Sequence, residues 1–412
     1  MTIIAPFRGL RPARGREADV CAPPYDVLNS AEARERAAGK PWSFLHVSKP
    51  EIDLPEDIDP YDDAVYAKAA ENFRKMIDEG ILIREERPVY FVYRLVWGDH
   101  EQTGLIAGAS VADYDSNRIR KHEHTRPVKE NDRVRQVEAV NAHTGPVMLA
   151  SPDSDEIERL LARASEGAPE LDVTADDGIR HSIWVVRDED LIRKLTDAFE
   201  ALPALYIADG HHRSAAASRV CAKRAEAEPD NMDAPWRRFL SVIFPARQMK
   251  ILDYNRVVRD LNGMDEAEFL DAVRRIFRVT ESTEPVKPER PGVFGMYVGG
   301  RWYRLEAPEG LVDTNDPLAR LDVSILQDNL LAPVLGIADP RTSERIDFVG
   351  GMRGLKELER RVDSGEMAVA FSLHPTSMDD LMRVADAGEV MPAKSTWFEP
   401  KLADGLVSLP LD

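Results

Sequence analysis

The chain has 412 residues, of which 43% are hydrophobic, and a formal net charge of -19. This length favours two domains with packed cores, and the negative charge argues against a nucleic-acid partner, because binding a phosphate backbone requires clustered Lys and Arg. The two cysteines, Cys21 and Cys221, offer no disulfide framework, and no apolar stretch reaches membrane-spanning length. We therefore expect a cytoplasmic protein with no membrane partner.

The first predicted elements are a loop, a helix and several strands. Residues 22–28 contain two prolines and are predicted to form a rigid extended segment that presents Tyr25 and Asp26. Helical periodicity covers 66–81, and strands at 88–97 and 104–111 are predicted to form a hairpin. A further strand is predicted at 181–186, where His181 is interpreted as structural.

A basic segment at 118–129 stands out in this acidic chain. If it is a strand, His122 and His124 share one face and Glu123 lies on the other. Metal binding and phosphate binding are both compatible with this pattern, and a solvated basic loop is the remaining possibility. A charged helix at 131–142 follows, and the turn at 143–146 could return His143 to the same site. The phosphate-binding candidates in this segment are Arg120, Lys121, His122 and Arg126.

The most informative residues are Asp209–Arg213, with the sequence Asp-Gly-His-His-Arg, which we call the glycine turn. A short apolar run at 204–207 precedes the turn and a helix at 215–224 follows it. The first amides of a helix lack intrahelical partners and carry partial positive charge, so an anion is favoured there. Gly210 would let the backbone approach a ligand, while Asp209 could cap the helix, bind a metal or orient a hydroxyl. Further donors would come from His211, His212 and Arg213; the alternative is a capped helix with surface histidines.

The pattern begins again after residue 261, which suggests a boundary between domains 1–260 and 261–412. A strand at 239–244 precedes this boundary, and a helix at 266–276 and strands at 291–298, 302–305 and 367–373 follow it. The alternation indicates an α/β or α+β fold with mixed sheets. Near the end, Lys394 stands with two hydroxyl residues beside aromatic ones, and could close an anion or nucleotide site from the C-terminal domain.

Five segments together resemble the prokaryotic domain-of-unknown-function family 1015 over nearly the whole chain. They are residues 23–26, 43–47, 121–125, 208–213 and 394–401, and the one departure noted is Ala393, where a second proline is expected. The glycine turn also resembles that of free-serine kinases, whose fold is similar to ParB and sulfiredoxin. This resemblance implies a ParB/sulfiredoxin-like core around the turn, a second C-terminal α+β region, and a nucleotide or pyrophosphate placed against the turn.

The function favoured by these features is that of a small-molecule kinase that phosphorylates the hydroxyl of free L-serine or a similar substrate. ATP, ADP or pyrophosphate would be the donor, with Mg2+ as cofactor. The glycine turn would hold the donor phosphates, and Lys121, His122 or Arg126 would offset charge on the transferred group. A carboxylate must accept or orient the hydroxyl proton. The catalytic candidates are Asp26, Glu123 and Asp209.

Two alternatives remain at this stage. One is a metal-dependent phosphohydrolase or nuclease that activates water on a bound metal. Its candidate ligands are His122, His124, His211 and His212, together with Asp209. The other is a non-catalytic ParB-like DNA-binding module, which the acidic balance disfavours.

Overall fold

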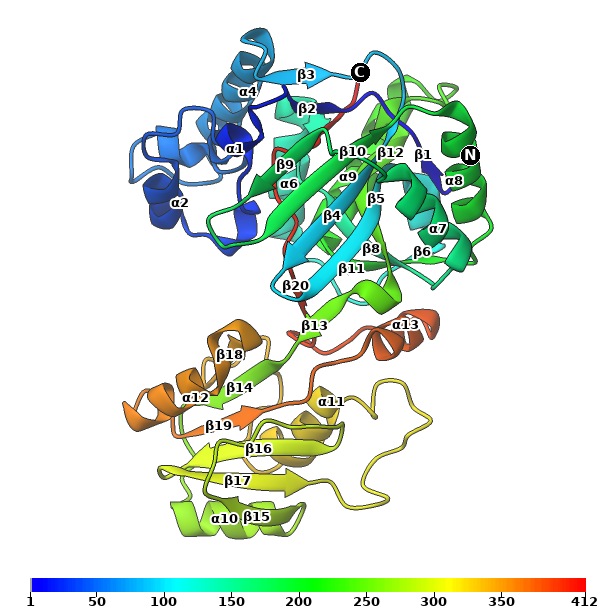
Figure 1. Ribbon diagram of the computed structural model, residues 1–412. Helices are drawn as coiled ribbons and strands as arrows, with labels where there is room; N and C mark the ends of the chain where they lie inside the picture. The colour runs from blue at the N-terminus through cyan, green and yellow to red at the C-terminus, as the bar shows by residue number, and fades with distance from the viewer. Residues whose placement is uncertain (1) are drawn as a thin grey trace. The chain divides into compact units, whose positions relative to one another are not determined.

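The computed structural model describes residues 2–412, and these form two compact units. The first unit runs to Met249 and also includes Pro400–Asp412, while the second is Lys250–Glu399. The red C-terminal segment in Figure 1 is the part that rejoins the first unit. Within the described residues, no helix is both long and apolar enough to cross a membrane.

Among the described residues, the first unit is built on a nine-stranded mixed sheet. Eight strands lie in the order β6-β11-β8-β12-β5-β4-β10-β9, and β1 also pairs with β5. The pairs β11–β6 and β12–β8 are parallel and the other pairs are antiparallel. The predicted hairpin is confirmed, because β4 and β5 pair in antiparallel register. The strands are β1 (Ile4–Ala5), β4 (Tyr90–Trp97), β5 (His100–Ser110), β6 (Ile119–Arg120), β8 (Val147–Ser151), β9 (Leu171–Thr174), β10 (Arg180–Val186), β11 (Leu205–Asp209) and β12 (Arg238–Pro245).

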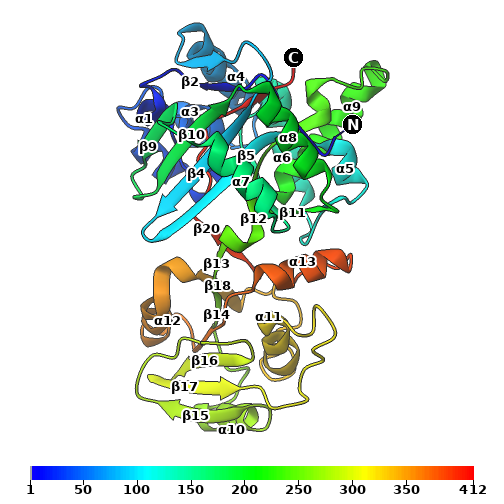
Figure 2. The ribbon, with the colours of Figure 1, turned by 45° about the vertical axis from the view of Figure 1, so that its right-hand side comes forward.

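Helices cover both faces of this sheet (Figure 1). Figure 2 shows α7 (Asp155–Ala164) and α8 (Glu189–Glu200) together on one face, while α6 (Pro127–Val140) and α9 (His211–Ala227) pack together on the other. The sequence explains this packing for α8, where Leu191, Leu195 and Phe199 recur at intervals of four and are buried. The remaining helices are α1 (Glu17–Val20), α2 (Ser30–Ala37), α3 (Leu45–Ser48), α4 (Asp63–Asp78) and α5 (Val111–Asp115).

The N-terminal helices α2, α3 and α4 share a smaller core beside the sheet, which includes Phe44, Phe73 and Met76. Two short strand pairs fasten distant segments of the unit. One joins β2 (Leu10–Pro12) to β3 (Leu82–Arg84), and the other joins β7 (Ala142–His143) to β21 (Leu409–Pro410). The β7–β21 pair holds the C-terminal segment in the first unit.

The second unit is built on a six-stranded antiparallel sheet in the order β15-β17-β16-β19-β14-β18. A separate two-stranded sheet joins β13 (Lys250–Leu252) to β20 (Trp397–Glu399). The sheet strands are β14 (Tyr254–Val258), β15 (Arg278–Ser282), β16 (Val293–Val298), β17 (Arg301–Glu306), β18 (Ile346–Gly350) and β19 (Val369–Ser372). The helices are α10 (Glu266–Arg274), α11 (Asp322–Leu326), α12 (Gly354–Asp363) and α13 (Met378–Asp386).

The structure confirms the mixed α/β class, but its division of the chain differs from the boundary predicted near residue 260. Strands β13 and β14 already belong to the second unit, because β13 pairs with β20 and β14 lies between β18 and β19. The chain then returns to the first unit at Pro400. A pairing with a strand more than a hundred residues away leaves no local signal at residue 250, which is why sequence periodicity placed the boundary later.

Candidate active site

The glycine turn joins β11 to α9, as the sequence predicted. Residues 205–208 of β11 are buried, and Gly210 precedes the first residue of α9 with a φ of 102°. A Cβ atom at this position would lie 3.2 Å from Arg213 Nε and 3.3 Å from Val147 Cα. Glycine is therefore required by both the backbone conformation and the space. Because of this turn, the strand ends with Asp209 beside the first residues of the helix.

Arg213 folds back over the turn and has two carboxylates near its Nη2 atom. Its Nη2 atom is 3.8 Å from Asp26 Oδ2 and 3.9 Å from Asp209 Oδ1, and its Nη1 atom donates to the carbonyl of Pro146. The side chain is 11% exposed. Burial by itself would lower the pKa of Arg213, but the charges of Asp26 and Asp209 outweigh burial and raise it. The site thus contains a fixed positive charge at the start of α9.

Asp209 has a second cationic partner in Lys401. The Lys401 Nζ atom lies 3.1 Å from Asp209 Oδ2. Burial would raise the pKa of Asp209, but Lys401 and Arg213 hold it well below its usual range. Asp209 is consequently ionised at any pH near neutrality. Lys401 comes from the C-terminal segment that rejoins the first unit.

Asp26 is positioned by its neighbour Tyr25. The segment predicted to be extended forms a short 3-10 turn at Tyr25–Val27 after Pro24. The guanidinium of Arg133, on α6, lies 3.9 Å from the centre of the Tyr25 ring. Asp132 pairs with Arg133 at 2.7 Å and accepts a hydrogen bond from the Tyr66 hydroxyl at 2.8 Å. This stacked arrangement holds the loop against α6, with Asp26 facing Arg213.

A histidine group lies at the turn, where His122 and Glu123 follow the neighbouring strand β6 and His211 begins α9. Because β6 pairs with β11, the His122 and His211 rings pack edge to face, with 4.5 Å between centroids. Glu123 Oε2 lies 3.8 Å from His211 Nδ1. Ligand atoms of His122, Glu123 and His211 lie within 4.8 Å of one another, so these residues could hold a metal ion.

Both imidazoles of this group are buried and neutral at pH 7. Burial lowers the pKa of His122 to about 4, although the Ile207 backbone and the charge of Asp209 oppose it. Burial and the nearby His122 lower the pKa of His211. Neither ring nitrogen of His122 makes a geometrically regular hydrogen bond within residues 2–412. A neutral imidazole has one N–H that can donate to an anion and one nitrogen that can coordinate a metal.

The other predicted residues of the basic segment lie around this group. The segment is not a strand beyond Arg120, so His122 and His124 do not share a face: His122 is buried and His124 is exposed. His212 Nε2 accepts a hydrogen bond from the backbone N–H of Arg126 at 3.0 Å, and the Arg126 side chain is exposed. The Lys121 ammonium lies 4.0 Å from the centre of the Tyr114 ring, and burial lowers the pKa of Lys121.

Lys394 belongs to the second unit, not to the unit that contains the turn. It has a positive φ of 59°, and its Nζ atom is 5.7 Å from the centre of the Tyr254 ring, in the same unit. The structure therefore gives Lys394 an aromatic partner within its own unit. Its predicted role at the turn stays a prediction.

Two residues beside the turn were missed by the sequence analysis as site residues, Lys401 and Asp404. Asp404 is 2% exposed, and its Oδ1 atom has no hydrogen-bond partner within residues 2–412. Burial raises its pKa to about 7, against the influence of Arg213. Asp404, Arg213 and His143 line a cavity of about 30 Å³, which has room for one or two waters. The only signal in the sequence was the run 394–401, in which Lys401 is the last residue.

The arrangement combines cations, carboxylates and a helix N-terminus in one place. Arg213 and Lys401 are positive, Asp209 is negative, and Asp26 is 44% exposed beside Arg213. Such a site can bind a multiply charged anion, orient a metal ion, and offer a carboxylate to a reacting hydroxyl.

Comparison with known proteins yields one family and several weak structural similarities. No curated protein matches the chain. A free serine kinase in complex with AMP has 14% identity and a TM-score of 0.35, covering 74% of this chain and 92% of that chain. A conserved hypothetical protein from Pyrococcus furiosus has 14% identity and a TM-score of 0.35, with 73% and 93% covered. SbnI with a C-terminal truncation, from Staphylococcus aureus, has 12% identity and a TM-score of 0.37, with 73% and 85% covered. Residues 4–324 match the model of the family described as protein of unknown function (DUF1015), and the chain therefore belongs to that family.

Proposed function

We propose that the protein is a small-molecule kinase that transfers a phosphoryl group from ATP, ADP or pyrophosphate to the hydroxyl of free L-serine or a similar small substrate in the cytoplasm. The observation that carries this proposal is the position of Arg213, buried at the start of α9 with Asp26 and Asp209 near its Nη2 atom. The resemblance of the glycine turn to that of free-serine kinases points to the same reaction.

The donor phosphates bind at the glycine turn. The amides that open α9, among Gly210, His211 and His212, have no partner within the helix, and Arg213 adds a charge-assisted hydrogen bond. His211 and His122 are neutral, so they donate hydrogen bonds but contribute no charge. Positive charge comes instead from Arg213 and Lys401, with Lys121 and Arg126 nearby. Phosphoryl transfer depends mainly on this kind of fixed electrostatic environment.

Asp26 is the carboxylate best suited to accept the hydroxyl proton. Asp209 is a poor base. Burial would raise its pKa, but the charges of Lys401 and Arg213 outweigh burial and hold the pKa well below the usual range. Asp209 is better suited to holding Mg2+, which prefers carboxylate oxygens and would neutralise phosphate charge when bound. Glu123 lies beside His211 and is the second candidate for the base.

In the proposed step, the serine oxygen forms a bond to the transferred phosphorus as its proton passes to Asp26. The bond between that phosphorus and the donor oxygen breaks, and the electron pair leaves with the donor. The second product is ADP from ATP, AMP from ADP, or inorganic phosphate from pyrophosphate. The Arg213 guanidinium faces the charge that is redistributed among the phosphate oxygens.

The test is to incubate purified protein and Mg2+ with pooled amino acids and each donor in turn, and to search for phosphorylated products by mass spectrometry. We expect O-phosphoserine, or one other phosphorylated hydroxyl compound, in a reaction reduced about a hundredfold or more by Asp26→Asn. Absence of any phosphorylated product with every donor and acceptor would contradict the proposal.

A metal-dependent phosphohydrolase is a second candidate, favoured by the group of His122, Glu123 and His211. Three ligands of this kind leave a coordination position open for water, as in catalytic zinc sites. The earlier ligand set changes, because His212 accepts a hydrogen bond from Arg126 and His124 lies outside the group. Titration of Zn2+ into the protein and into a His122→Ala variant tests this reading. Tight binding that is lost in the variant, together with donor hydrolysis without an acceptor, would favour it.

A further inference from the structure

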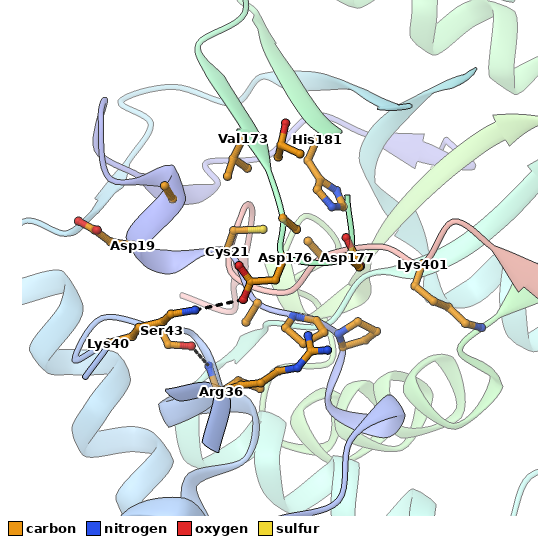
Figure 3. A pocket seen from close by; sticks show the side chains of 18 of the residues that line it. Asp19, Cys21, Arg36, Lys40, Ser43, Val173, Asp176, Asp177, His181 and Lys401 are labelled. Atoms are coloured by element: carbon orange, nitrogen blue, oxygen red, sulfur yellow. Dashed lines mark hydrogen bonds and ion pairs between the residues drawn. The ribbon is translucent and has the colours of Figure 1, made fainter. Parts of the chain in front are cut away.

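A separate cavity of about 280 Å³ lies in the first unit, with Lys401 among its lining residues (Figure 3). It is lined by the loop that carries Cys21, Pro23 and Pro24, by α2, and by the turn between β9 and β10. Its volume is near the lower end of the range for small-molecule sites, about 300 to 1,000 Å³. Ser43 and His181 are among its lining residues and are 4% and 3% exposed. The cavity therefore has a polar, buried floor and space for a small ligand.

His181 supplies this floor with a buried imidazole held by a hydrogen bond to Tyr93. The Tyr93 hydroxyl lies 2.7 Å from His181 Nδ1, and the same hydroxyl accepts the N–H of Ala403 at 3.2 Å. We assign the Tyr93 proton to Nδ1, which places the proton of the neutral imidazole on Nε2. Burial lowers the pKa of His181 to about 4, so the ring is neutral at pH 7. In Figure 3 the ring points towards Asp177.

Cys21 is a lining residue of a different kind. Burial raises the pKa of its thiol to about 12, and the carboxylates of Asp177 and Asp404 act in the same direction. The thiolate needed for nucleophilic chemistry is therefore not populated. The cavity is suited to binding and not to covalent catalysis by Cys21.

Most charges around the cavity are already paired. Lys40 pairs with Asp176 at 3.1 Å, Asp19 pairs with Arg16 at 2.9 Å, and Lys401 pairs with Asp209. Within residues 2–412, the lining residues that make no ion pair are one cation, Arg36, and one carboxylate, Asp177. Figure 3 shows the Arg36 side chain extending into the cavity. One unpaired charge of each sign is complementary to a zwitterion.

We propose that this cavity binds the acceptor as a free α-amino acid, with its carboxylate on Arg36 and its ammonium on Asp177. His181 Nε2–H and the Ser43 hydroxyl complete the polar floor. The cavity shares Lys401 with the glycine turn, and its lining residues Pro23 and Pro24 lead directly to Tyr25 and Asp26. The proposed base therefore follows the cavity lining directly in the chain.

This assignment rests on the proposed function only for its role as the acceptor site, because amino-acid binding can be measured without any donor. The proteinogenic amino acids are tested one at a time by thermal shift, in the presence and absence of pyrophosphate, and L-serine is then titrated calorimetrically. We expect L-serine to bind, and ethanolamine and 3-hydroxypropanoate, which lack the carboxylate and the ammonium, to bind at least tenfold more weakly.

The variants Arg36→Gln and Asp177→Asn are each expected to raise the Kd for L-serine about tenfold or more. Arg14→Gln and Asp57→Asn change the same groups at exposed positions away from the cavity and should leave the Kd unchanged. Amino-acid binding that depends on Arg36 and Asp177 without phosphoryl transfer would support this site and refute the kinase. Serine phosphorylation with an unchanged KM in both variants would refute this site and leave the kinase intact. No binding of any amino acid under either condition would also refute the site.

Discussion

Replacing Arg213 with lysine separates the catalytic role of this residue from its structural one. Removing the side chain entirely would leave Asp26 without its nearby cation and Asp209 with Lys401 alone, so a loss of turnover could not be separated from a loss of stability. Arg213→Lys keeps the positive charge but loses the planar fork of donors. The lost hydrogen bond to the Pro146 carbonyl costs about 0.5–1.5 kcal/mol of stability. The fold should therefore survive.

The fall in turnover should be much larger than the small loss of stability can explain. Loss of one fixed contact to the reacting phosphate costs about 2.7–4 kcal/mol in the transition state, about a hundred- to thousandfold in kcat. The assay compares serine phosphorylation and melting temperature for Arg213→Lys and for Arg11→Lys. Arg11 is a matched control because it is 9% exposed, pairs with Glu85 at 2.7 Å and donates to a proline carbonyl. Near-normal turnover in a folded Arg213→Lys protein would refute the proposed role.

Three further predictions concern the surroundings of the turn. Asp404→Asn should stabilise the protein at pH 8 by up to about 4 kcal/mol and change its stability little at pH 5. Burial raises the folded pKa of Asp404 to about 7, so the folded carboxyl keeps a proton that the unfolded chain releases between about pH 4 and 7. Equal effects in denaturant unfolding at both pH values would contradict this. His143→Gln should make the free energy of unfolding fall less as the pH drops from about 6.5 to 4. Burial lowers the folded pKa of His143 to about 4, so only the unfolded chain takes up a proton in that range. An unchanged pH profile of unfolding would count against this. Gly210→Ala should cost about 1–3 kcal/mol of stability and lower turnover by moving Arg213. The control Gly39→Ala, at a position with a φ of 73° and open space around it, should lower stability without changing turnover. Equal turnover in the two variants would exclude displacement of Arg213.

The local structure of the glycine turn could be predicted because its causes are local. An apolar run, one glycine and a helix-forming segment specify β11, the turn at Gly210 and α9. The proximity of the basic segment to this turn was implied by the kinase hypothesis, in which both segments face the same phosphates. The structure confirms that proximity through the β6–β11 pairing and the contact between His122 and His211.

The partners of the turn from distant segments could not be predicted in the same way. The pairing of Lys401 with Asp209 depends on the return of the C-terminal segment through β21, which no periodicity reveals. The expectation that His122 and His124 share a face depended on a strand that ends at Arg120. His181 was interpreted as structural, and its buried contact with Tyr93 agrees with that interpretation. Its proposed role in the cavity could not be predicted, because the lining segments meet only in the fold.

The most direct test of the central claim follows the fate of a radiolabelled phosphoryl group. Purified protein, Mg2+ and L-serine are mixed with each donor labelled in its terminal phosphate, and the label is separated into phosphoserine and inorganic phosphate. With ATP or ADP as donor, we expect label in phosphoserine, at a rate that falls about a hundredfold or more in Arg213→Lys. Label released only as inorganic phosphate, at the same rate with and without serine, would contradict the kinase and favour the phosphohydrolase.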